Sequence, residues 1–453
     1  MRFSSTGLVF ILFSVPLYAA SPTPSRENKP QIADVVHDIS AKNIEATIRK
    51  LVSFGTRHTL SETASKTHGI GAAREWIQSE FARYSTDSGG RLQVAMDEFT
   101  QPPGPRNPQP VQVVNVVATL PGSQPEARDR IYVVTGHYDS RVTDVMNATA
   151  DAPGADDDAS GVAAVMEMAR VMSKRNWDAT LVFIAVAGEE QGLFGSTHWA
   201  KMAKEKNWNV AGMITNDIVG SSRADDGHSD KTHVRLFAEG VPPVRETSDE
   251  LRTLVRTGGE NDSPARELAR FIKTVAEKNV PAMTVNVIYR RDRYLRGGDH
   301  SPFLDAGFPA VRMTEPNEDF RHQHQDLRKE GDVQFGDLPE FCDFDYIAQV
   351  ARVNAAALGM LALAPASPRN VQIEAKELTN STTLTWSANN EPDLAGYEIV
   401  WRDTTAPDWQ HSSEAGNVTR FTSPISKDNV IFGVRAVDKD GNASPAVYPL
   451  PAK

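Results

Sequence analysis

Three almost continuously apolar segments in the middle of the chain constrain its fold more than any other feature. They are IYVVTG, LVFIAVAG and AGMITN, and they alternate with segments that have the apolar spacing of helices. The first helical segment, residues 159–172, carries one apolar face, formed by Val162, Val165, Met166 and Ala169. A strand that is apolar along its whole length must be covered on both faces. The alternation therefore predicts an α/β fold, with a mostly parallel central sheet and helices on both faces.

The composition changes after residue 368 toward short segments in which apolar and polar residues alternate. TTLTW, GYEIVWR and IFGVRAVD have this period of two and are separated by Asn, Asp, Pro and Gly. The pattern predicts a small all-β sandwich over residues 369–453, following the α/β part. With Trp386, Tyr397 and Phe432, the segment resembles a fibronectin type III module, although Val430 stands where many such modules have a tyrosine.

The first residues of the sequence predict export. MRFSSTGLVFILFSVPLYAA has one Arg, an apolar run and small residues at its end, so we expect a signal peptide over residues 1–20 and a secreted or periplasmic protein. Residues 21–40 are expected to be a linker or a short pro-segment. No later segment reaches the length of a membrane span, so none is expected. The formal net charge of −11 argues against a nucleic acid partner.

Acidic residues and histidines follow the predicted strands at the points where the strands end. The set comprises His137, Asp139, Glu189, Glu190, Asp217 and the three carboxylates at 156–158. The carboxyl ends of parallel strands meet at one edge of a sheet, where α/β proteins assemble their sites. Carboxylates gathered at one edge repel each other unless cations neutralise them. The sequence therefore favours a metal site over a coincidence of surface and helix-capping acids.

The residue types indicate which metal this site would bind. Imidazole and carboxylate groups without a thiolate suit zinc or another first-row ion better than calcium. One catalytic zinc uses about three protein ligands, and the set offers more candidates than that. The sequence therefore predicts two metal ions that share a carboxylate and a water, an arrangement suited to amide hydrolysis.

The motifs around these residues resemble those of a known enzyme family. They are GHYDS, GADDDASG, AGEEQGLFGS, Asn216-Asp217, GGDHSPFLDAGFPAVR and a later histidine. In this order they are similar to the co-catalytic di-zinc aminopeptidases, exported bacterial and fungal exopeptidases that include leucine aminopeptidase-like enzymes. The resemblance covers residues 41–363 and implies a zinc exopeptidase-like peptidase domain over residues 41–364.

The resemblance also implies which residues bind two zinc ions. His137 and Asp217 would bind the first ion, and Asp157, the third residue after Gly154, would bridge both ions. Glu190 would bind the second ion.

Two neighbours of these ligands receive other roles from the same resemblance. Glu189 would be the general base that takes a proton from the bridging water and returns it to the leaving amine. Asp139 would hold the ring of His137 through its second nitrogen.

The last ligand should be a histidine in the segment EPNEDFRHQHQDLR, which offers two. His322 has an aspartate four positions on, as in the commoner family pattern. His324 lies in Gln-His-Gln, which resembles a variant in which the central histidine binds. We take His324 as the ligand and keep His322 as the alternative.

These features predict an exported zinc aminopeptidase that acts on peptides with a free amino terminus. A glutaminyl cyclase-like enzyme with a single zinc is the nearest alternative, and carboxypeptidase or dipeptidase activity is another. A non-catalytic surface-binding protein is also open, with surface or polymer contact through the C-terminal module. The presence of Glu189 argues against the last option, because a binding scaffold needs no general base.

Overall fold

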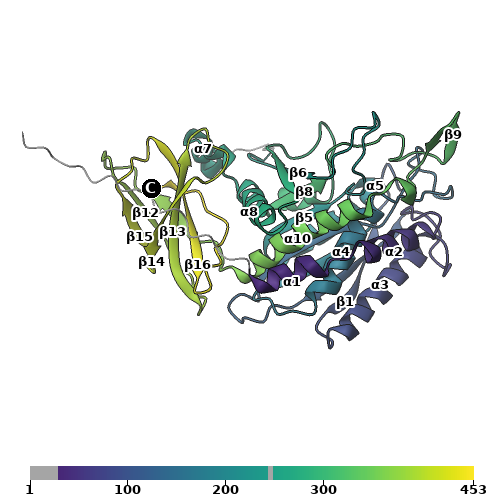
Figure 1. Cartoon of the computed structure of the whole chain (residues 1–453), viewed down its shortest axis with the longest axis horizontal. Helices are drawn as coiled ribbons and strands as arrows, with labels where there is room; N and C mark the ends of the chain where they lie inside the picture. The colour runs from purple at the N-terminus through teal and green to yellow at the C-terminus, as the bar shows by residue number, and fades with distance from the viewer. Residues whose placement is uncertain (1–28, 243–247, 453) are drawn as a thin grey trace, which may run out of the picture.

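The computed structural model describes residues 29–242 and 248–452, which form an α/β part and an all-β part (Figure 1). The predicted signal peptide, residues 1–20, lies outside the described residues. The α/β part is built on an eight-stranded sheet in the order β1-β2-β4-β3-β5-β8-β6-β7. Its strands are β1 (Gln93–Gln101), β2 (Val111–Leu120), β3 (Arg130–His137), β4 (Thr180–Val186), β5 (Asn209–Asn216), β6 (His233–Ala238), β7 (Thr284–Ile288) and β8 (Ala310–Thr314).

The sheet is mostly parallel, as the alternation of strands and helices predicted. β3 lies near its centre and pairs in parallel with β4 and β5, and β5 pairs in parallel with β8. β1 and β2 extend one edge in antiparallel fashion, and β6 is antiparallel to β8. The four parallel strands β4, β3, β5 and β8 therefore end at the same edge of the sheet, which is where the predicted site residues follow them.

Helices cover both faces of the sheet. On one face lie α1 (Pro30–Asp38), α2 (Ala41–Val52), α3 (Gly69–Asp87), α4 (Ala159–Met172), α8 (Pro264–Asn279) and α10 (Phe344–Leu363), and on the other lie α6 (Phe194–Glu205) and α9 (His300–Ala306). In β3, Val134 belongs to the first core and Val133 to the second, because successive side chains of a strand point to opposite faces. The central strands β3, β4 and β5 are almost continuously apolar, as burial of both faces requires.

Part of the segment that we expected to be a linker belongs to the core. Residues 30–38 form α1, whose Ile32 and Val35 are fully buried. These side chains join the same apolar core as α10. The expectation of a linker over residues 21–40 is therefore wrong from Pro30 onward, because Ile32 and Val35 lie on one face of a helix, three residues apart.

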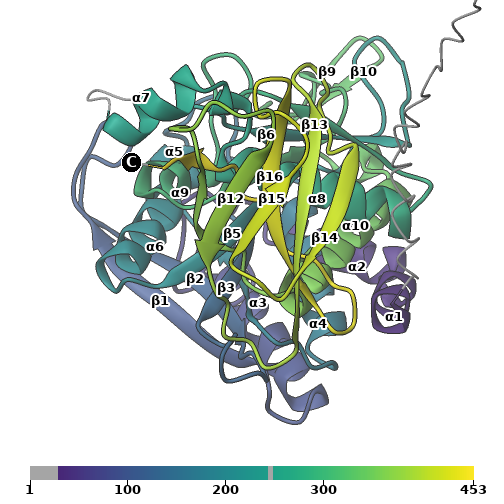
Figure 2. The same ribbon diagram turned by 90° about the vertical axis from the view of Figure 1, so that its left-hand side faces the viewer.

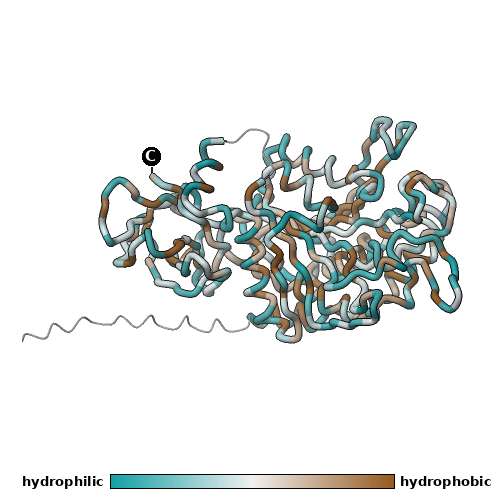
Figure 3. The backbone as a smooth tube through the Cα atoms, turned by 90° about the horizontal axis from the view of Figure 1, so that it is seen from above, coloured by the Kyte–Doolittle hydropathy of each residue, from teal (hydrophilic) through white to brown (hydrophobic). Residues whose placement is uncertain are grey.

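The long helix α10 is a core element. Among the described residues, it is the one helix that is long and apolar enough to cross a membrane, but 78% of its apolar window is buried inside the protein. Apolar segments run through the interior of both parts of the chain (Figure 3).

The C-terminal residues form two small sheets that face each other, the predicted sandwich (Figure 2). Their strands are β11 (Arg369–Ile373), β12 (Thr382–Ser387), β13 (Leu394–Asp403), β14 (His411–Gly416), β15 (Arg420–Ser423), β16 (Val430–Asp438) and β17 (Leu450–Pro451). Trp386, Tyr397 and Phe432 lie in the core between the sheets. The resemblance of this sandwich to a fibronectin type III module stays a prediction.

Buried ion pairs fasten the sandwich to the α/β part. Asp262, just before α8, accepts hydrogen bonds from Arg402 of β13 through both carboxylate oxygens, at 2.8 and 2.9 Å. Arg270 of α8 also donates to Asp262, at 2.9 Å. A second buried pair joins Arg130 of β3 to Glu391, at 3.1 Å. The sandwich and the α/β part are therefore held together by charged groups that water does not reach.

Replacing Asp262 should destabilise the whole chain. The variant Asp262→Ala leaves the buried guanidinium of Arg402 without its carboxylate, so we expect a loss of about 3–5 kcal/mol in the free energy of unfolding. Urea unfolding followed by tryptophan fluorescence measures this loss. Asp249→Ala is the matched control, because Asp249 pairs with Arg252 at the exposed surface of α7 (Asp249–Arg256) and such pairs contribute little. Equal losses in the free energy of unfolding for the two variants would contradict the role of Asp262 as the buried partner of Arg402.

Candidate metal centre

Five of the predicted site residues converge at the carboxyl edge of the central strands. His137 is the last residue of β3, Asp157 lies in the loop before α4, and Asp217 follows β5 directly. Glu190 lies in the short helix α5 (Glu189–Gly192) after β4, and His324 lies in the loop after β8. The residues come from five separate segments, and the parallel sheet is what brings them together.

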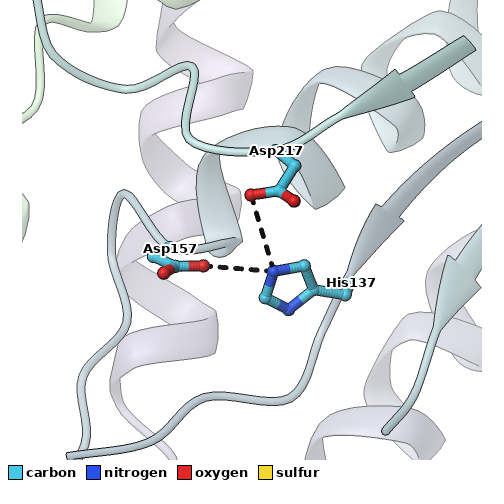
Figure 4. A group of neighbouring side chains, drawn as sticks. All are labelled: His137, Asp157 and Asp217. Carbon is cyan, nitrogen blue, oxygen red and sulfur yellow. Dashed lines mark ion pairs between the residues drawn. The ribbon is translucent and has the colours of Figure 1, made fainter. Parts of the chain in front are cut away.

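Two groups of ligand atoms share Asp157. In the first group, Nε2 of His137 lies 3.1 Å from Oδ1 of Asp157 and 3.9 Å from Oδ1 of Asp217 (Figure 4). In the second group, Nε2 of His324 lies 2.8 Å from Oδ2 of Asp157 and 2.9 Å from Oε1 of Glu190. The two oxygens of Asp157 thus face different groups, as a bridging carboxylate requires.

The geometry and donor types of both groups fit a metal ion. Each group offers three nitrogen or oxygen atoms that lie within 4.8 Å of one another. The Nε2 atom of His137 is buried and has no hydrogen-bond partner in the described part of the chain, although Asp157 lies close by. Imidazole with two carboxylates is a donor set that zinc accepts. The residues present therefore fit zinc at both groups.

In the acidic loop, the run of carboxylates at residues 156–158, burial and neighbouring charges shift the pKa values of Asp157 and Asp158 in opposite directions. Burial raises the pKa of Asp157, but the neighbouring His324 and His137 outweigh it and hold this pKa well below its usual value. Burial raises the pKa of Asp158 well above its usual value. The carboxylate of Asp158 accepts hydrogen bonds from the backbone N–H of His137 and from that of Gly161 in the first turn of α4. Asp158 thus caps the helix α4. Asp157 is the carboxylate that stays anionic and faces His137 and His324.

Asp139 contacts the ring of His137 mainly through its backbone carbonyl. Nδ1 of His137 lies 3.2 Å from the backbone carbonyl of Asp139 and 3.7 Å from its carboxylate. The carboxylate instead accepts hydrogen bonds from the backbone N–H groups of Gly188 and Glu190, at 3.0 and 3.2 Å. The expected contact of Asp139 with the second ring nitrogen of His137 is present, and the backbone carbonyl of Asp139 lies nearer to that nitrogen than its carboxylate does. The carboxylate caps the turn that carries Glu190, because the first N–H groups of α5 have no partner within the helix.

Glu189 lies beside the two groups of ligands without belonging to either. Within residues 29–242 and 248–452, its carboxylate has no hydrogen bond or ion pair, and the side chain is partly exposed. Burial raises the pKa of Glu189 well above its usual value, with His137 as an opposing influence. The side chain is thus free to exchange a proton with a molecule that enters the site.

The structure separates the two histidine candidates. His322 stacks on Phe341 with a centroid distance of 3.7 Å and is absent from both groups of ligand atoms. His324 has a left-handed backbone, with φ of 56°, and its ring faces Asp157 and Glu190. A non-glycine residue in this conformation is strained, and such residues gather at functional sites.

Sequence reasoning missed Arg57, which is fully buried beneath the site. Its guanidinium donates to the backbone carbonyls of Tyr138 at 2.7 Å, Pro153 at 2.6 Å and Gly154 at 2.8 Å. Burial lowers the pKa of Arg57 to about 10. Arg57 therefore ties the segment after His137 to the loop that carries Asp157. No pattern in the sequence distinguishes this arginine from the others.

Asp337 was also missed, and it fixes the backbone of the acidic loop. Its two carboxylate oxygens accept hydrogen bonds from the backbone N–H groups of Asp156 and Asp157, both at 2.8 Å. The contact bridges about half the length of the α/β part in sequence, so no local motif reveals it. Asp337 thus positions the backbone of Asp157 and with it the candidate bridging carboxylate.

Removing the Asp337 carboxylate should weaken zinc binding, because the loop that carries Asp157 loses two hydrogen bonds. The variant Asp337→Ala leaves two buried N–H groups without acceptors, and we expect zinc affinity to fall by about 10–100-fold, the effect usual for groups that orient metal ligands. Competition with a chromophoric zinc chelator measures this affinity. Asp332→Ala, which changes an exposed aspartate five residues earlier, is the control. An unchanged affinity in Asp337→Ala would show that the loop holds its position by other contacts.

Comparisons with known proteins agree with this geometry. The model of peptidase family M28 matches residues 115–333, a range that contains all five candidate ligands. A probable zinc metalloprotease of the fungus Leptosphaeria maculans is 55% identical over 430 residues, covering 95% of this chain and 98% of the relative.

Solved structures share the fold at low sequence identity. The aminopeptidase from Aneurinibacillus sp. strain AM-1 has a TM-score of 0.52 at 15% identity, covering 73% of this chain and 96% of that protein. The glutaminyl cyclase of Fimbriiglobus ruber has a TM-score of 0.51 at 18% identity, covering 75% and 99%. The match to the family model and the similarity to a relative along nearly its whole length show that the chain belongs to peptidase family M28.

Proposed function

We propose that the protein is an exported zinc aminopeptidase that hydrolyses residues from the free amino end of peptides. The observation that carries this proposal is the pair of ligand groups that share Asp157, with Glu189 beside them. The relative from Leptosphaeria maculans, named a probable zinc metalloprotease, supports zinc as the metal. The aminopeptidase from Aneurinibacillus supports the choice of the amino end through its fold alone.

The two groups of side chains would hold two zinc ions. His137, Asp157 and Asp217 would bind one ion, and Asp157, Glu190 and His324 the other. When bound, such a pair of ions acidifies water and polarises the carbonyl of the peptide bond. Arg312 supports the first group, because its guanidinium lies 2.9 Å from Oδ1 of Asp217 and is fully buried.

Glu189 would transfer the proton during hydrolysis. Its raised pKa, which burial causes, makes the carboxylate a stronger base than an ordinary glutamate. It would take a proton from the attacking water and give it to the amine that leaves when the peptide bond breaks. The Asp139 carboxylate accepts hydrogen bonds from the backbone N–H groups of Glu189 and Glu190, at 3.3 and 3.2 Å, and so fixes the turn in which these adjacent residues would have separate roles.

A glutaminyl cyclase is the second candidate. The solved cyclase from Fimbriiglobus ruber covers this chain to nearly the same extent as the aminopeptidase does. A cyclase-like enzyme with one zinc would need only one of the two ligand groups. The presence of both groups with a common carboxylate favours the peptidase.

Export and the C-terminal module belong to the same proposal. The predicted signal peptide supports a secreted or periplasmic location.

The fibronectin type III-like sandwich was a candidate for contact with a surface or polymer. Its buried fastening through Asp262 and Arg402 supports a bracing role for this sandwich against α8.

Replacing Glu189 by Gln tests the general base. The variant keeps the size of the side chain but cannot accept a proton, so we expect turnover to fall by about 10²–10⁴-fold while zinc content stays unchanged. Turnover of a leucine-led peptide and metal analysis of the same sample measure both quantities. Hydrolysis at the normal rate in Glu189→Gln would refute the mechanism.

The substrate class is tested with one leucine-led peptide and its N-acetylated twin. We expect stepwise shortening of the free peptide only, because the acetyl group removes the terminal amine, and we expect a zinc chelator to stop the reaction. Mass spectrometry over time follows both peptides. Shortening of both twins would contradict an aminopeptidase, and loss of ammonia from a glutamine-led peptide would support the cyclase instead.

A further inference from the structure

Each group of ligands touches an arginine, and the two arginines make different contacts. Arg312 contacts the first group through the carboxylate of Asp217. Arg141 contacts the second group twice, because its Nε lies 2.9 Å from Oε2 of Glu190 and its terminal nitrogen lies 2.6 Å from Nδ1 of His324. The second group is thus the one in which a guanidinium faces the ring of a ligand.

The chemistry of the two contacts differs. A carboxylate has several lone pairs, so Asp217 can accept a hydrogen bond from Arg312 and still bind a metal ion. A neutral histidine that binds a metal through Nε2 carries its proton on Nδ1. In His324, that proton would point at a nitrogen of Arg141, which is also a donor. The present contact of Arg141 with His324 and metal binding by His324 therefore exclude each other.

Arg141 is anchored where it stands. Its side chain is 17% exposed, and a further nitrogen donates to the backbone carbonyl of Val142 at 3.2 Å. The hydroxyl of Thr143, in the same segment, donates to the backbone carbonyl of His324 at 3.1 Å. The segment that carries Arg141 is thus attached to the loop that carries His324, and the arginine cannot move away without breaking contacts.

We propose that Arg141 competes with the second metal ion for His324 and makes this site the weaker of the two. The inference rests on the proposed function, because it takes both groups to be zinc sites. Binding at the second group requires Arg141 to release the ring of His324, whereas Glu190 keeps one oxygen for Arg141 and one for the metal. At the first group no contact has to be given up, since Arg312 and a metal share the carboxylate of Asp217.

The test is a zinc titration of the full chain after removal of bound metal by a chelator. Isothermal titration calorimetry and competition with a chromophoric chelator give the affinity of each site without any turnover. We expect two classes of site in the unchanged protein. In Arg141→Met, which keeps the apolar stem, the weaker class should tighten by about tenfold or more, with the stronger class changed by less than about threefold, the range in which altered surroundings of a ligand act.

Arg106→Met is the matched control. Arg106 donates to the backbone carbonyl of Glu190 at 2.7 Å, so this variant removes the same charge beside the same ligand but breaks no contact with a histidine ring. A smaller gain in zinc affinity at the weaker class of site in Arg106→Met than in Arg141→Met supports the proposal. Equal gains in affinity would contradict it, because net charge alone would then explain the effect. An unchanged or lower affinity of the weaker class in Arg141→Met would also overturn it.

The result is separable from a failure of the proposed function. A chain that binds one zinc ion in every variant refutes the two-site assumption and with it this proposal. A chain that shows the expected affinities but leaves the free leucine-led peptide intact keeps the role of Arg141 and refutes the aminopeptidase.

Discussion

The site depends on a buried cation, Arg57, that binds backbone carbonyls. The carbonyls of Tyr138 and Gly154 flank the two segments that carry His137 and Asp157, and the guanidinium draws both to one point. A buried charge without partners is costly, and here hydrogen bonds to several carbonyls offset that cost. The positive charge also lies near the carboxylates of Asp157, Asp158 and Asp337, which otherwise repel each other. The positive charge of Arg57 therefore offsets part of the repulsion among these acids before any metal binds.

Sequence reasoning found the site residues whose positions follow from the local pattern of strands and motifs. His137, Glu190 and Asp217 follow central strands directly, and the ends of parallel strands must meet at one edge. His324 was chosen through a resemblance in its local motif, and the structure brings its ring to Asp157. The helix α10 spans Phe344–Leu363, where the apolar pattern of the sequence is long and uninterrupted.

Sequence reasoning failed where distant segments decide the outcome. The segments that form β2 and β3 follow each other in the chain, but β4 lies between them in the sheet, and no local pattern encodes that order. Asp337 and Arg57 act on backbone groups far away in the sequence, so their residue types alone carry no signal. The motif around Asp139 does not show which of its oxygen atoms, the carbonyl or the carboxylate, lies nearer to the ring of His137.

The hairpin formed by β9 (Arg328–Glu330) and β10 (Val333–Phe335) lies in the chain between His324 and Asp337. Its base is closed by a hydrogen bond from the backbone N–H of Gly336 to the carbonyl of Arg321, at 3.1 Å. This contact fixes the two ends of the segment independently of the residues at its tip. Lengthening a loop whose ends are already fixed costs little conformational entropy. The tip of this hairpin is therefore a suitable position for an inserted epitope or fluorescent label that leaves the candidate metal ligands undisturbed.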